Sequence, residues 1–374
     1  MKILYLITKS EAGGAQSHVY DLCNYFGKQN EVIVMSYPGG WLEDESKKIG
    51  IKFIGNKYFS NKLNLFDVFR FIKEVKEVVK EFQPNIIHCH SSGAGFVGRL
   101  AVKNKIPTIF TAHGWGFNIG VPFLQKIIAI LAEKIVSKYC DKIICVSKFV
   151  KDLGLKYKIA KEEKFEVIYN GIESKVHKSI KFQPEAGQPL AVKVRIIFVG
   201  RLVEPKDPLI LIKAYEELSN ELKDGTEINI VGDGPKKNEL EKFIKQNEIE
   251  NIKLLGSLPR ESVFDMMNRS DVFVLVSQYE GFPITILEAM GAGLSIVASD
   301  VGGIKEVVEN GINGFLLKNN SVEELKNILE KLIEDKDLRE KMGVFSKKKV
   351  LENFSIDTML KKTEKIYNEI LEKK

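Results

Sequence analysis

Short apolar runs alternate with amphipathic stretches along the first half of the chain. Runs such as KILYLI and NIIHCH have the apolar content of buried strands, whereas LFDVFRFIKEVKEVVKEF carries apolar residues three and four positions apart, as a helix requires. This repeat of strand and helix predicts a parallel sheet covered by helices on both faces. The other strands expected here are EVIVMS, TIFTAH and KIICVS, and the other expected helices are 15–27, FVGRLAVKN and FLQKIIAILAEKIVSKY.

The same alternation restarts near residue 194, with strands such as RIIFVG, INIVG and DVFVLV. A segment rich in Pro, Gly, Gln and Lys separates the halves, and we interpret it as a linker. The expected fold class is α/β, with two tandem Rossmann-like doubly wound parallel-sheet domains facing across a cleft that holds the ligand. The expected parts are a first domain at 1–173, the linker at 174–193, a second domain at 194–352 and a helix at 353–374 that packs back on the first domain.

Length and composition agree with two soluble domains. The chain has 374 residues, of which 44% are hydrophobic and 28% charged, and no apolar run approaches the ~20 residues of a membrane span. Lys9 and Glu11 follow the opening MKILYLIT directly, which favours a first buried strand over a signal peptide. Four cysteines without CxxC spacing favour reduced thiols in a cytoplasmic protein over a disulfide between Cys140 and Cys145.

The charge is uneven along the chain. Residues 1–180 contain 27 Lys and Arg against 17 Asp and Glu, a net charge of +10, whereas the remainder has 29 against 33, a net charge of −4. A basic first half predicts contact with an anionic partner, or simply solvated helix faces. The helix at 64–82 combines phenylalanines with lysines, so it is expected either to rest on an anionic membrane leaflet or to turn its apolar stripe toward the sheet. We expect no contact with nucleic acid.

The most informative string is EGFPITILEAMGAG at residues 280–293. A strand pattern precedes Glu280, and Pro283 favours a helix start that places Glu288 one to two turns into the helix. Backbone N–H groups at such a helix start favour an anion. The two carboxylates can then hold hydroxyl groups at the two ends of a nucleotide sugar, with its diphosphate between them. Two unrelated solvated glutamates are a poorer interpretation of the whole string.

Two cations follow the strand in FVGRLVEPKDP. Arg201 and Lys206 at a strand's carboxyl end suit a diphosphate, Arg as a fork and Lys as a point charge. No DxD-like acidic pair follows a strand, so we expect no metal ion and no other cofactor.

Glycine turns follow two further strands. Gly13 and Gly14 in SEAGGAQSHV allow close approach of backbone to a ligand at a helix start. Gly232 in VGDGP is either a tight turn or a support under the nucleotide base. GxGxxG and the P-loop pattern are both absent, which disfavours a dinucleotide-dependent oxidoreductase.

The histidines divide by position. His113 ends the strand TIFTAH and is expected in the site, and His18 lies on the first helix. His88 and His90 in HCH suggest a metal site, but no third ligand is evident from the sequence, so a strand-end interpretation is favoured. His177 is expected on the linker surface.

These strings together resemble a known family. GGAQSHV, TAHG, the Asn-Gly at 170–171, GRLVEPKDP, VGDGP and EGFPITILEAMGAGLSIVASDVGGIKEVVENGINGFL are similar to the retaining glycosyltransferases of family 4, which have the GT-B fold. The resemblance covers nearly the whole chain, and the E-x7-E string is its most specific part. Asp207 stands where many relatives have Gly, which we expect to affect the turn and not the chemistry.

The resemblance implies an activity and residue roles. The activity is metal-independent transfer of a hexosyl or N-acetylhexosaminyl group, with retention, from a nucleoside diphosphate donor, UDP being favoured, to a glycan or polyprenyl-diphosphate-linked acceptor. In the implied roles Glu288 holds the ribose, Glu280 holds the donor sugar, and His113 lies near the sugar's 6-hydroxyl. The candidate catalytic residues are His113, Glu280, Arg201 and Lys206; the candidate donor-binding residues are Gly13, Gly14, Asn170, Gly200, Arg201, Lys206, Gly232, Leu258, Glu280, Gly281, Phe282, Pro283, Ile284, Thr285 and Glu288; the candidate acceptor-binding residues are Gln16, His18, Trp115 and Phe117.

Two rival functions remain at this point. A sugar-nucleotide epimerase on a similar two-domain fold needs the same donor contacts but no acceptor. A non-catalytic sugar-binding protein is disfavoured, because every charged donor position is filled. We expect a cytoplasmic enzyme, with contact to the inner face of the cell membrane as an open alternative.

Overall fold

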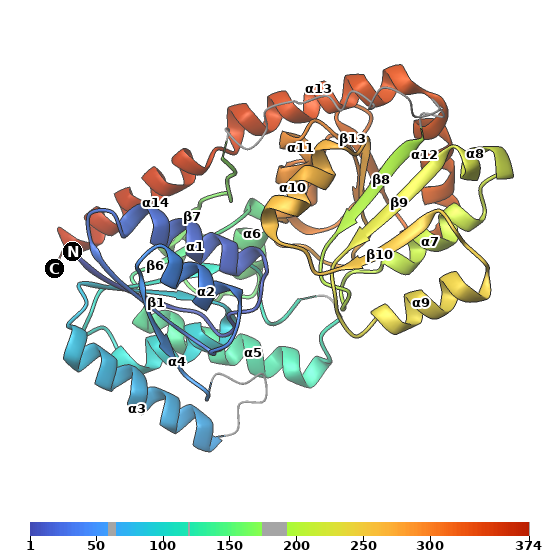
Figure 1. Ribbon diagram of the computed structural model, residues 1–374. Coiled ribbons are helices and arrows are strands. Elements are labelled where there is room, and N and C mark those ends of the chain that lie inside the picture. Colours follow the sequence, from blue (N-terminus) through green and yellow to red (C-terminus); the bar gives the residue numbers. More distant parts are fainter. Residues whose placement is uncertain (59–64, 119, 174–192, 374) are drawn as a thin grey trace. The chain divides into compact units, whose positions relative to one another are not determined.

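The computed structural model describes residues 1–58, 65–118, 120–173 and 193–373 (Figure 1). The chain folds into two compact units. The first comprises Met1–Asn170 together with Asp357–Lys374, and the second comprises Gly171–Ile356. The predicted linker lies outside the described residues except for Lys193, and the predicted domain limits stay predictions.

The first unit is built on a seven-stranded sheet in the order β3-β2-β1-β4-β5-β6-β7, with every pairing parallel. Its central strands are fully buried, because apolar side chains on both faces are covered. The first strand occupies the opening segment, as the sequence predicted. The strands are β1 (Lys2–Leu6), β2 (Glu31–Ser36), β3 (Lys52–Gly55), β4 (Ile86–His90), β5 (Thr108–Ala112), β6 (Lys142–Cys145) and β7 (Phe165–Val167).

The second unit is built on a six-stranded parallel sheet in the order β10-β9-β8-β11-β12-β13. In both sheets the strand order reverses beside the first strand of the unit, so β1 lies between β2 and β4, and β8 between β9 and β11. Ligands of open parallel sheets bind at the carboxyl ends of strands near such a reversal. The strands are β8 (Val194–Val199), β9 (Thr226–Val231), β10 (Ile252–Gly256), β11 (Val272–Leu275), β12 (Ser295–Ser299) and β13 (Gly314–Leu317).

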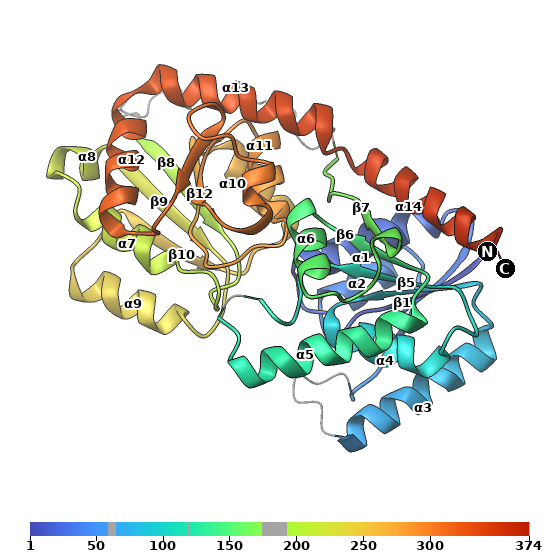
Figure 2. The ribbon, with the colours of Figure 1, turned by 180° about the vertical axis from the view of Figure 1, so that it is seen from behind.

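Helices connect the strands and cover the sheets, as Figures 1 and 2 show from opposite sides. The first unit contains α1 (Gly14–Phe26), α2 (Trp41–Lys48), α3 (Leu65–Phe82), α4 (Ser92–Val102), α5 (Phe123–Val136), α6 (Lys148–Lys156) and α14 (Ile356–Leu371, from Asp357). The second contains α7 (Pro208–Glu216), α8 (Asn220–Asp224), α9 (Lys237–Gln246), α10 (Arg260–Asn268), α11 (Ile284–Gly291), α12 (Val322–Glu334) and α13 (Lys336–Asn353).

The predicted fold class is confirmed: each half of the chain forms a Rossmann-like parallel sheet. The sequence pattern missed α2, α6, α8 and α10, together with the short edge strands β3 and β7. All four cysteines are free and buried, so the alternative of a Cys140–Cys145 disulfide is wrong. Among the described residues, no helix is both long and apolar enough to cross a membrane.

Helix α3 shows features of both arrangements that the sequence left open. Phe71 and Val75 are fully buried, so this part of the apolar stripe faces the protein, whereas Phe66 and Phe69 are 78% and 70% exposed. The larger exposed apolar face belongs instead to α5. Its exposed apolar residues are Phe123, Leu124, Ile127, Ile128, Leu131 and Ile135.

Helix α14, near the C-terminus, packs against the sheet of the first unit. The Tyr367 hydroxyl lies 3.1 Å from the Tyr5 hydroxyl and 2.6 Å from Nδ1 of His88, all of them buried. Nε2 of His88 lies 2.7 Å from the hydroxyl of Thr111. This polar chain connects α14 with β1, β4 and β5, and its members satisfy one another in the core.

We expect Tyr367→Phe to lower the free energy of unfolding by about 1–3 kcal/mol, because the change leaves buried hydrogen-bonding groups of Tyr5 and His88 without this partner. The measurement is urea unfolding followed by circular dichroism. The matched control is Tyr25→Phe, which removes the 3.2 Å bond from the Tyr25 hydroxyl to Glu364 at a partly buried position and should cost no more than about 0.5 kcal/mol. Equal losses in the two variants contradict the buried network.

Candidate functional site

Glycines form the turns that follow β8 and β9 in the second unit. A Cβ atom on Gly232 would lie 1.9 Å from the carbonyl oxygen of Gly200, and the φ angle of Gly232 is +144°. The N–H of Gly232 donates to the carbonyl oxygen of Gly256, the last residue of β10, and the N–H of Gly200 donates to that of Val231. These contacts leave no room for a side chain, so two strand ends meet as bare backbone.

A carboxylate and an ammonium group meet beside these turns. Glu280 follows β11 and its carboxylate pairs with the ammonium group of Lys206, which follows β8. Their side chains are only 12% and 18% exposed. Arg201, the other predicted cation, is exposed. A mostly desolvated ion pair at the strand ends is a preformed pair of binding groups for an anion and a hydroxyl.

A second close approach fixes the backbone of Glu280. Gly302 has a φ angle of +57°, and a Cβ atom there would lie 1.8 Å from the carbonyl oxygen of Glu280. The N–H of Gly303 donates to that oxygen at 3.1 Å. The Val-Gly-Gly sequence at 301–303 therefore holds the loop that presents Glu280.

The other predicted carboxylate, Glu288, lies inside α11. It is only 7% exposed, and its Oε1 accepts a 3.4 Å hydrogen bond from Nη2 of Arg260, the first residue of α10. Burial raises the pKa of Glu288, and the charge of Arg260 opposes that rise. Pro283 is the N-cap residue of α11 and not its first helical residue, so Ile284 and Thr285 provide the first N–H groups of the helix.

The remaining predicted donor-binding residues of this unit lie near the same loops. Gly281 and Phe282 follow Glu280, and Phe282 is buried against Phe354 with ring centroids 5.4 Å apart. Leu258 is half-buried between β10 and α10. Asp207, where relatives have Gly, precedes α7 as its N-cap residue and donates its N–H to Val276, so it takes part in the turn as expected.

In the first unit, the glycine turn after β1 opens α1. Gly13 is the N-cap residue and Gly14 the first residue of the helix. The side chain of Gln16 turns back and donates to the carbonyl oxygen of Lys9 at 2.9 Å. This arrangement places bare backbone at a helix start, as expected of a phosphate contact.

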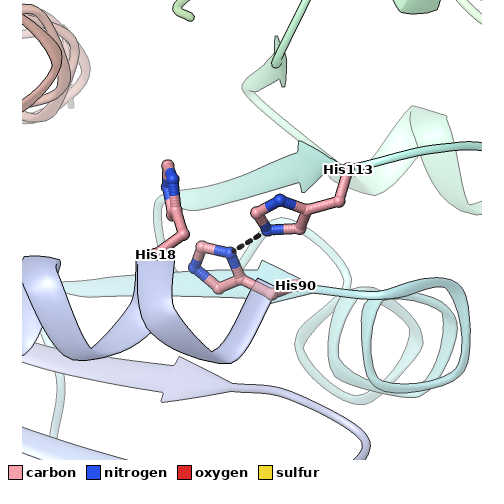
Figure 3. A group of neighbouring side chains, drawn as sticks. All are labelled: His18, His90 and His113. Carbon is pink, nitrogen blue, oxygen red and sulfur yellow. Dashed lines mark hydrogen bonds between the residues drawn. The ribbon is translucent and has the colours of Figure 1, made fainter. Parts of the chain in front are cut away.

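Three histidines from separate elements come together beside that turn (Figure 3). His18 lies on α1, His90 ends β4 and His113 follows β5, and one ring nitrogen of each lies within 4.8 Å of those of the other two. Nδ1 of His90 lies 3.1 Å from Nε2 of His113, and Nδ1 of His18 lies 3.0 Å from the side-chain oxygen of Asn170. Burial lowers the pKa of all three, that of His18 to about 4, so the rings are neutral at neutral pH.

The sequence interpretation of HCH needs correction on two points. Both ring nitrogens of His88 form hydrogen bonds, one with Tyr367 and one with Thr111, so His88 belongs to the core network. His90 does have histidine neighbours, because α1 and the segment after β5 bring His18 and His113 to it. Spacing along one strand contains no trace of partners that other elements supply.

Trp115 and Phe117 do not offer an acceptor surface. Both are 1% exposed and stack on each other with ring centroids 5.3 Å apart. The indole N–H of Trp115 donates to the carbonyl oxygen of Val150 at 2.7 Å. The predicted acceptor role of these two residues is therefore wrong: apolar surface and a satisfied indole place them in the core.

Arg260 is a candidate site residue that the sequence analysis missed, because it contacts Glu288. It was not named from the sequence, although it follows a strand end and Pro259, as Arg201 follows Gly200. Its partner Glu288 lies 28 positions later in the chain. The sequence feature that could have indicated Arg260 is a cation at the start of a helix, directly after a strand of the sheet that carries the other candidate residues.

Comparison with known proteins agrees with this architecture. Residues 12–176 match the family described as Glycosyltransferase Family 4, and residues 182–349 match Glycosyl transferases group 1. The solved structure of HepE from Anabaena in complex with UDP-glucose is 21% identical, with a TM-score of 0.82 over 99% of this chain and 100% of that one. WaaG, a glycosyltransferase involved in lipopolysaccharide biosynthesis, is 17% identical, with a TM-score of 0.76 over 98% and 99%. These structures have the GT-B fold.

Curated relatives identify the family. An uncharacterized glycosyltransferase of Methanocaldococcus jannaschii, MJ1178, is 30% identical over 96% of this chain and 95% of its own length. The O-antigen biosynthesis glycosyltransferase WbnH of Escherichia coli is 29% identical over 94% and 96%. The chain belongs to the family 4 glycosyltransferases with the GT-B fold.

The environment of Glu288 generates a prediction for the ligand-free protein. Because burial raises its pKa, folding favours the protonated form, so Glu288 contributes less to stability as the pH rises from its unfolded pKa, near 4.3, through its folded pKa. We expect the unfolding free energy of Glu288→Gln to increase relative to the wild type over that range. Glu261→Gln, at an exposed position on α10, is the control and should show a constant difference.

Denaturant unfolding at a series of pH values measures this difference. A gap between Glu288→Gln and the wild type that does not change with pH would mean that the carboxylate is already compensated in the ligand-free protein.

Proposed function

We propose that the protein transfers a hexosyl or N-acetylhexosaminyl group from a nucleoside diphosphate donor, a UDP-sugar, to a glycan acceptor, with retention of the anomeric configuration and without a metal ion. The observation that carries the proposal is the pair of charge contacts in the second unit. Two carboxylates are each paired with a cation in the part of this unit that follows its strands: Glu280 with Lys206 on loops, and Glu288 in α11 with Arg260 at the start of α10. HepE binding UDP-glucose on the same fold supports the choice of donor.

Glu288 is assigned to the ribose. A carboxylate accepts two hydrogen bonds from neighbouring hydroxyl groups, and these bonds offset the desolvation that raises its pKa. Arg260 holds the carboxylate in position before the donor arrives. Gly232 and Gly200 provide the bare backbone beside which a flat base packs.

The diphosphate is assigned to Lys206 and Arg201, together with the first N–H groups of α11. Lys206 then divides its hydrogen bonds between phosphate and Glu280, and Glu280 accepts hydrogen bonds from sugar hydroxyls with its other lone pairs. Fixed positive charge at the leaving diphosphate stabilises the charge that develops as the glycosidic bond breaks. These cations take the place of a metal ion.

Retention follows in the proposal from attack on the face that the diphosphate leaves. The acceptor hydroxyl forms the new C–O bond as the bond to the diphosphate breaks, and its proton passes to a diphosphate oxygen. No protein carboxylate is needed as a covalent nucleophile. His113, a neutral imidazole, is assigned to the transferred sugar near its 6-hydroxyl, with Gly14 at the phosphate and Asn170 holding His18.

A lipid-linked glycan is the proposed acceptor. One relative, 29% identical over 79% of this chain and 80% of its own length, is a UDP-Gal:alpha-D-GlcNAc-diphosphoundecaprenol alpha-1,3-galactosyltransferase of Escherichia coli. Such an acceptor is held in a membrane, so an enzyme that uses it has to reach a membrane surface. We place that contact on the first unit, in the cytoplasm.

Helix α5 supplies the surface for this contact. Phe123, Leu124 and Ile128 are 79%, 68% and 58% exposed on one face. Its single acidic residue, Glu133, is turned inward, where it accepts a 2.8 Å hydrogen bond from the buried Arg99. The outer face therefore combines apolar side chains with Lys126 and Lys134 and carries no acid. This combination suits an anionic bilayer interface.

Helix α3 continues the same surface. Both α3 and α5 pack against α4, and Figures 1 and 2 show them along one side of the first unit. Its exposed Phe66 and Phe69 add apolar area, whereas its charges balance, since Lys73 is paired with Glu77. The membrane surface proposed from the sequence is thus retained with α5 at its centre.

The donor assignment is tested with a panel of nucleotide sugars and Glu288→Ala. Loss of two charged hydrogen bonds, worth about 1.5–3 kcal/mol each, should weaken binding of UDP-sugar at least about a hundredfold in titration calorimetry. Glu261→Ala on the exposed face of α10 is the control and should bind as the wild type does. Unchanged donor affinity in a folded Glu288→Ala protein contradicts the ribose assignment.

The membrane surface is tested by co-sedimentation with vesicles. We expect binding to vesicles rich in phosphatidylglycerol, weaker at physiological than at low salt, and none to neutral phosphatidylcholine vesicles. Replacing Leu124 and Ile128 by Glu should lower the partition coefficient at least about tenfold, because two apolar side chains no longer insert.

Val344→Glu is the matched control, since Val344 is 69% exposed on α13 of the second unit. An equal loss in both proteins, or no binding of the wild type at low salt, would leave a soluble glycan as the acceptor.

A further inference from the structure

The cluster of His18, His90 and His113 has features that sugar contact does not require. Only His113 was assigned to the donor, yet His90 lies 3.1 Å from it and is buried. Nε2 of His90 is buried and has no hydrogen-bond partner among the described residues. The other ring nitrogen of His90, Nδ1, faces Nε2 of His113, and two imidazole nitrogens that face each other at this distance can both turn a lone pair toward a metal ion.

We propose that His18, His90 and His113 form a binding site for a divalent transition metal, Zn²⁺ being the best match. Zinc binds imidazole nitrogens at about 2.0–2.1 Å in tetrahedral geometry, which places two ligand nitrogens about 3.3 Å apart. The His90 and His113 nitrogens, at 3.1 Å, are already near this spacing. His18 completes the set with a shift of at most roughly 1.5 Å from its present limit of 4.8 Å.

The hydrogen bond of His18 with Asn170 sets the ring tautomer that metal ligation requires. Nδ1 of His18 faces the side-chain oxygen of the buried Asn170, and an amide oxygen only accepts, so Nδ1 carries the hydrogen and Nε2 keeps its lone pair. A ligating histidine whose other nitrogen donates to an oxygen is the usual arrangement around a bound metal. Asn170 thus orients the ring of His18 for ligation.

The His90–His113 contact changes character when a metal binds. In the present structure these two nitrogens share one hydrogen. A metal ion replaces that hydrogen, which moves to the other nitrogen of the same ring, and both facing nitrogens then donate lone pairs. Three protein ligands leave a fourth position of the tetrahedron for water. Soft thiolates are missing from the set, so Zn²⁺, Co²⁺ or Ni²⁺ is favoured over Cu⁺.

The ion has no part in the proposed transfer reaction and instead opposes it. Metal on Nε2 of His113 replaces the exchangeable contact with His90, so this nitrogen can no longer turn to the donor sugar and Zn²⁺ should slow transfer reversibly. This consequence rests on the proposed role of His113, whereas metal binding itself does not.

The test is calorimetric titration of the full-length, tag-free chain with ZnCl₂ near neutral pH. We expect one ion per chain, with binding at least about a hundredfold weaker in His90→Ala and unchanged in His177→Ala, which removes a histidine expected on the linker. CoCl₂ should give the visible absorption of tetrahedral cobalt in the wild type and in His177→Ala, but not in His90→Ala. Absence of saturable binding, or equal binding in His90→Ala, overturns the proposal.

X-ray absorption at the zinc edge gives a second test that needs no variant. Three imidazole ligands on bound zinc support the site, and oxygen-dominated coordination overturns it. Zinc that binds without slowing transfer would remove His113 from the donor site and leave the metal site standing. Transferase activity without any zinc binding would overturn the metal site and leave the proposed function standing.

Discussion

Two carboxylates in the second unit cannot stay charged at their positions without partners. Glu288 is 7% exposed and the Glu280 side chain 12%, so water solvates neither fully. Each is met by one cation, Arg260 or Lys206. Desolvated ion pairs contribute little to the free energy of unfolding, because desolvation offsets their attraction. The main effect of these two pairs is that both carboxylates are fixed in position. The rest of the second unit follows from the need to hold these four groups in place.

Backbone geometry supplies that support. The strand ends of β8, β9 and β10 approach one another through glycines, because any side chain at Gly232 would overlap the carbonyl oxygen of Gly200. Gly302 approaches the carbonyl oxygen of Glu280 in the same way. The glycines thus bring together the loops that carry Glu280 and Lys206, whereas Glu288 and Arg260 lie on the helices α11 and α10. Replacing these glycines would shift the loops and the Glu280 carboxylate, although it would remove no charged group from the site.

The first unit follows a different principle, in which neutral polar groups satisfy one another. Tyr367, Tyr5, His88 and Thr111 form a chain inside the core, and His18 bonds Asn170 at its edge. Burial keeps the histidines uncharged, which suits both contact with a sugar and ligation of a metal. The buried pair of Arg99 with Glu133 is an exception, in which a cation is compensated by a carboxylate.

The periodicity of apolar residues sufficed for both sheets, because buried parallel strands and amphipathic helices leave strong local patterns. The helix start between Glu280 and Glu288 could also be predicted from the sequence, since a carboxylate, a glycine and a helix-starting proline are local features.

What could not be predicted is what distant elements bring together. Arg260 meets Glu288 only after α10 and α11 pack side by side, and His18 meets His90 only after α1 packs on the sheet. Trp115 and Phe117 were placed in the site because they follow His113. Their burial against Val150 and each other depends on α6, which no local pattern reveals.

The most direct measurement of the central claim is the anomeric configuration of the product formed from a UDP-sugar and a lipid-linked glycan in the presence of excess EDTA. Proton NMR of the isolated product distinguishes the α and β linkages by their coupling constants. The account predicts full activity under chelation and a product with the same anomeric configuration as the donor. Inversion of that configuration, or activity that EDTA abolishes and Mg²⁺ restores, would contradict transfer driven by Lys206 and Arg201 at the leaving diphosphate.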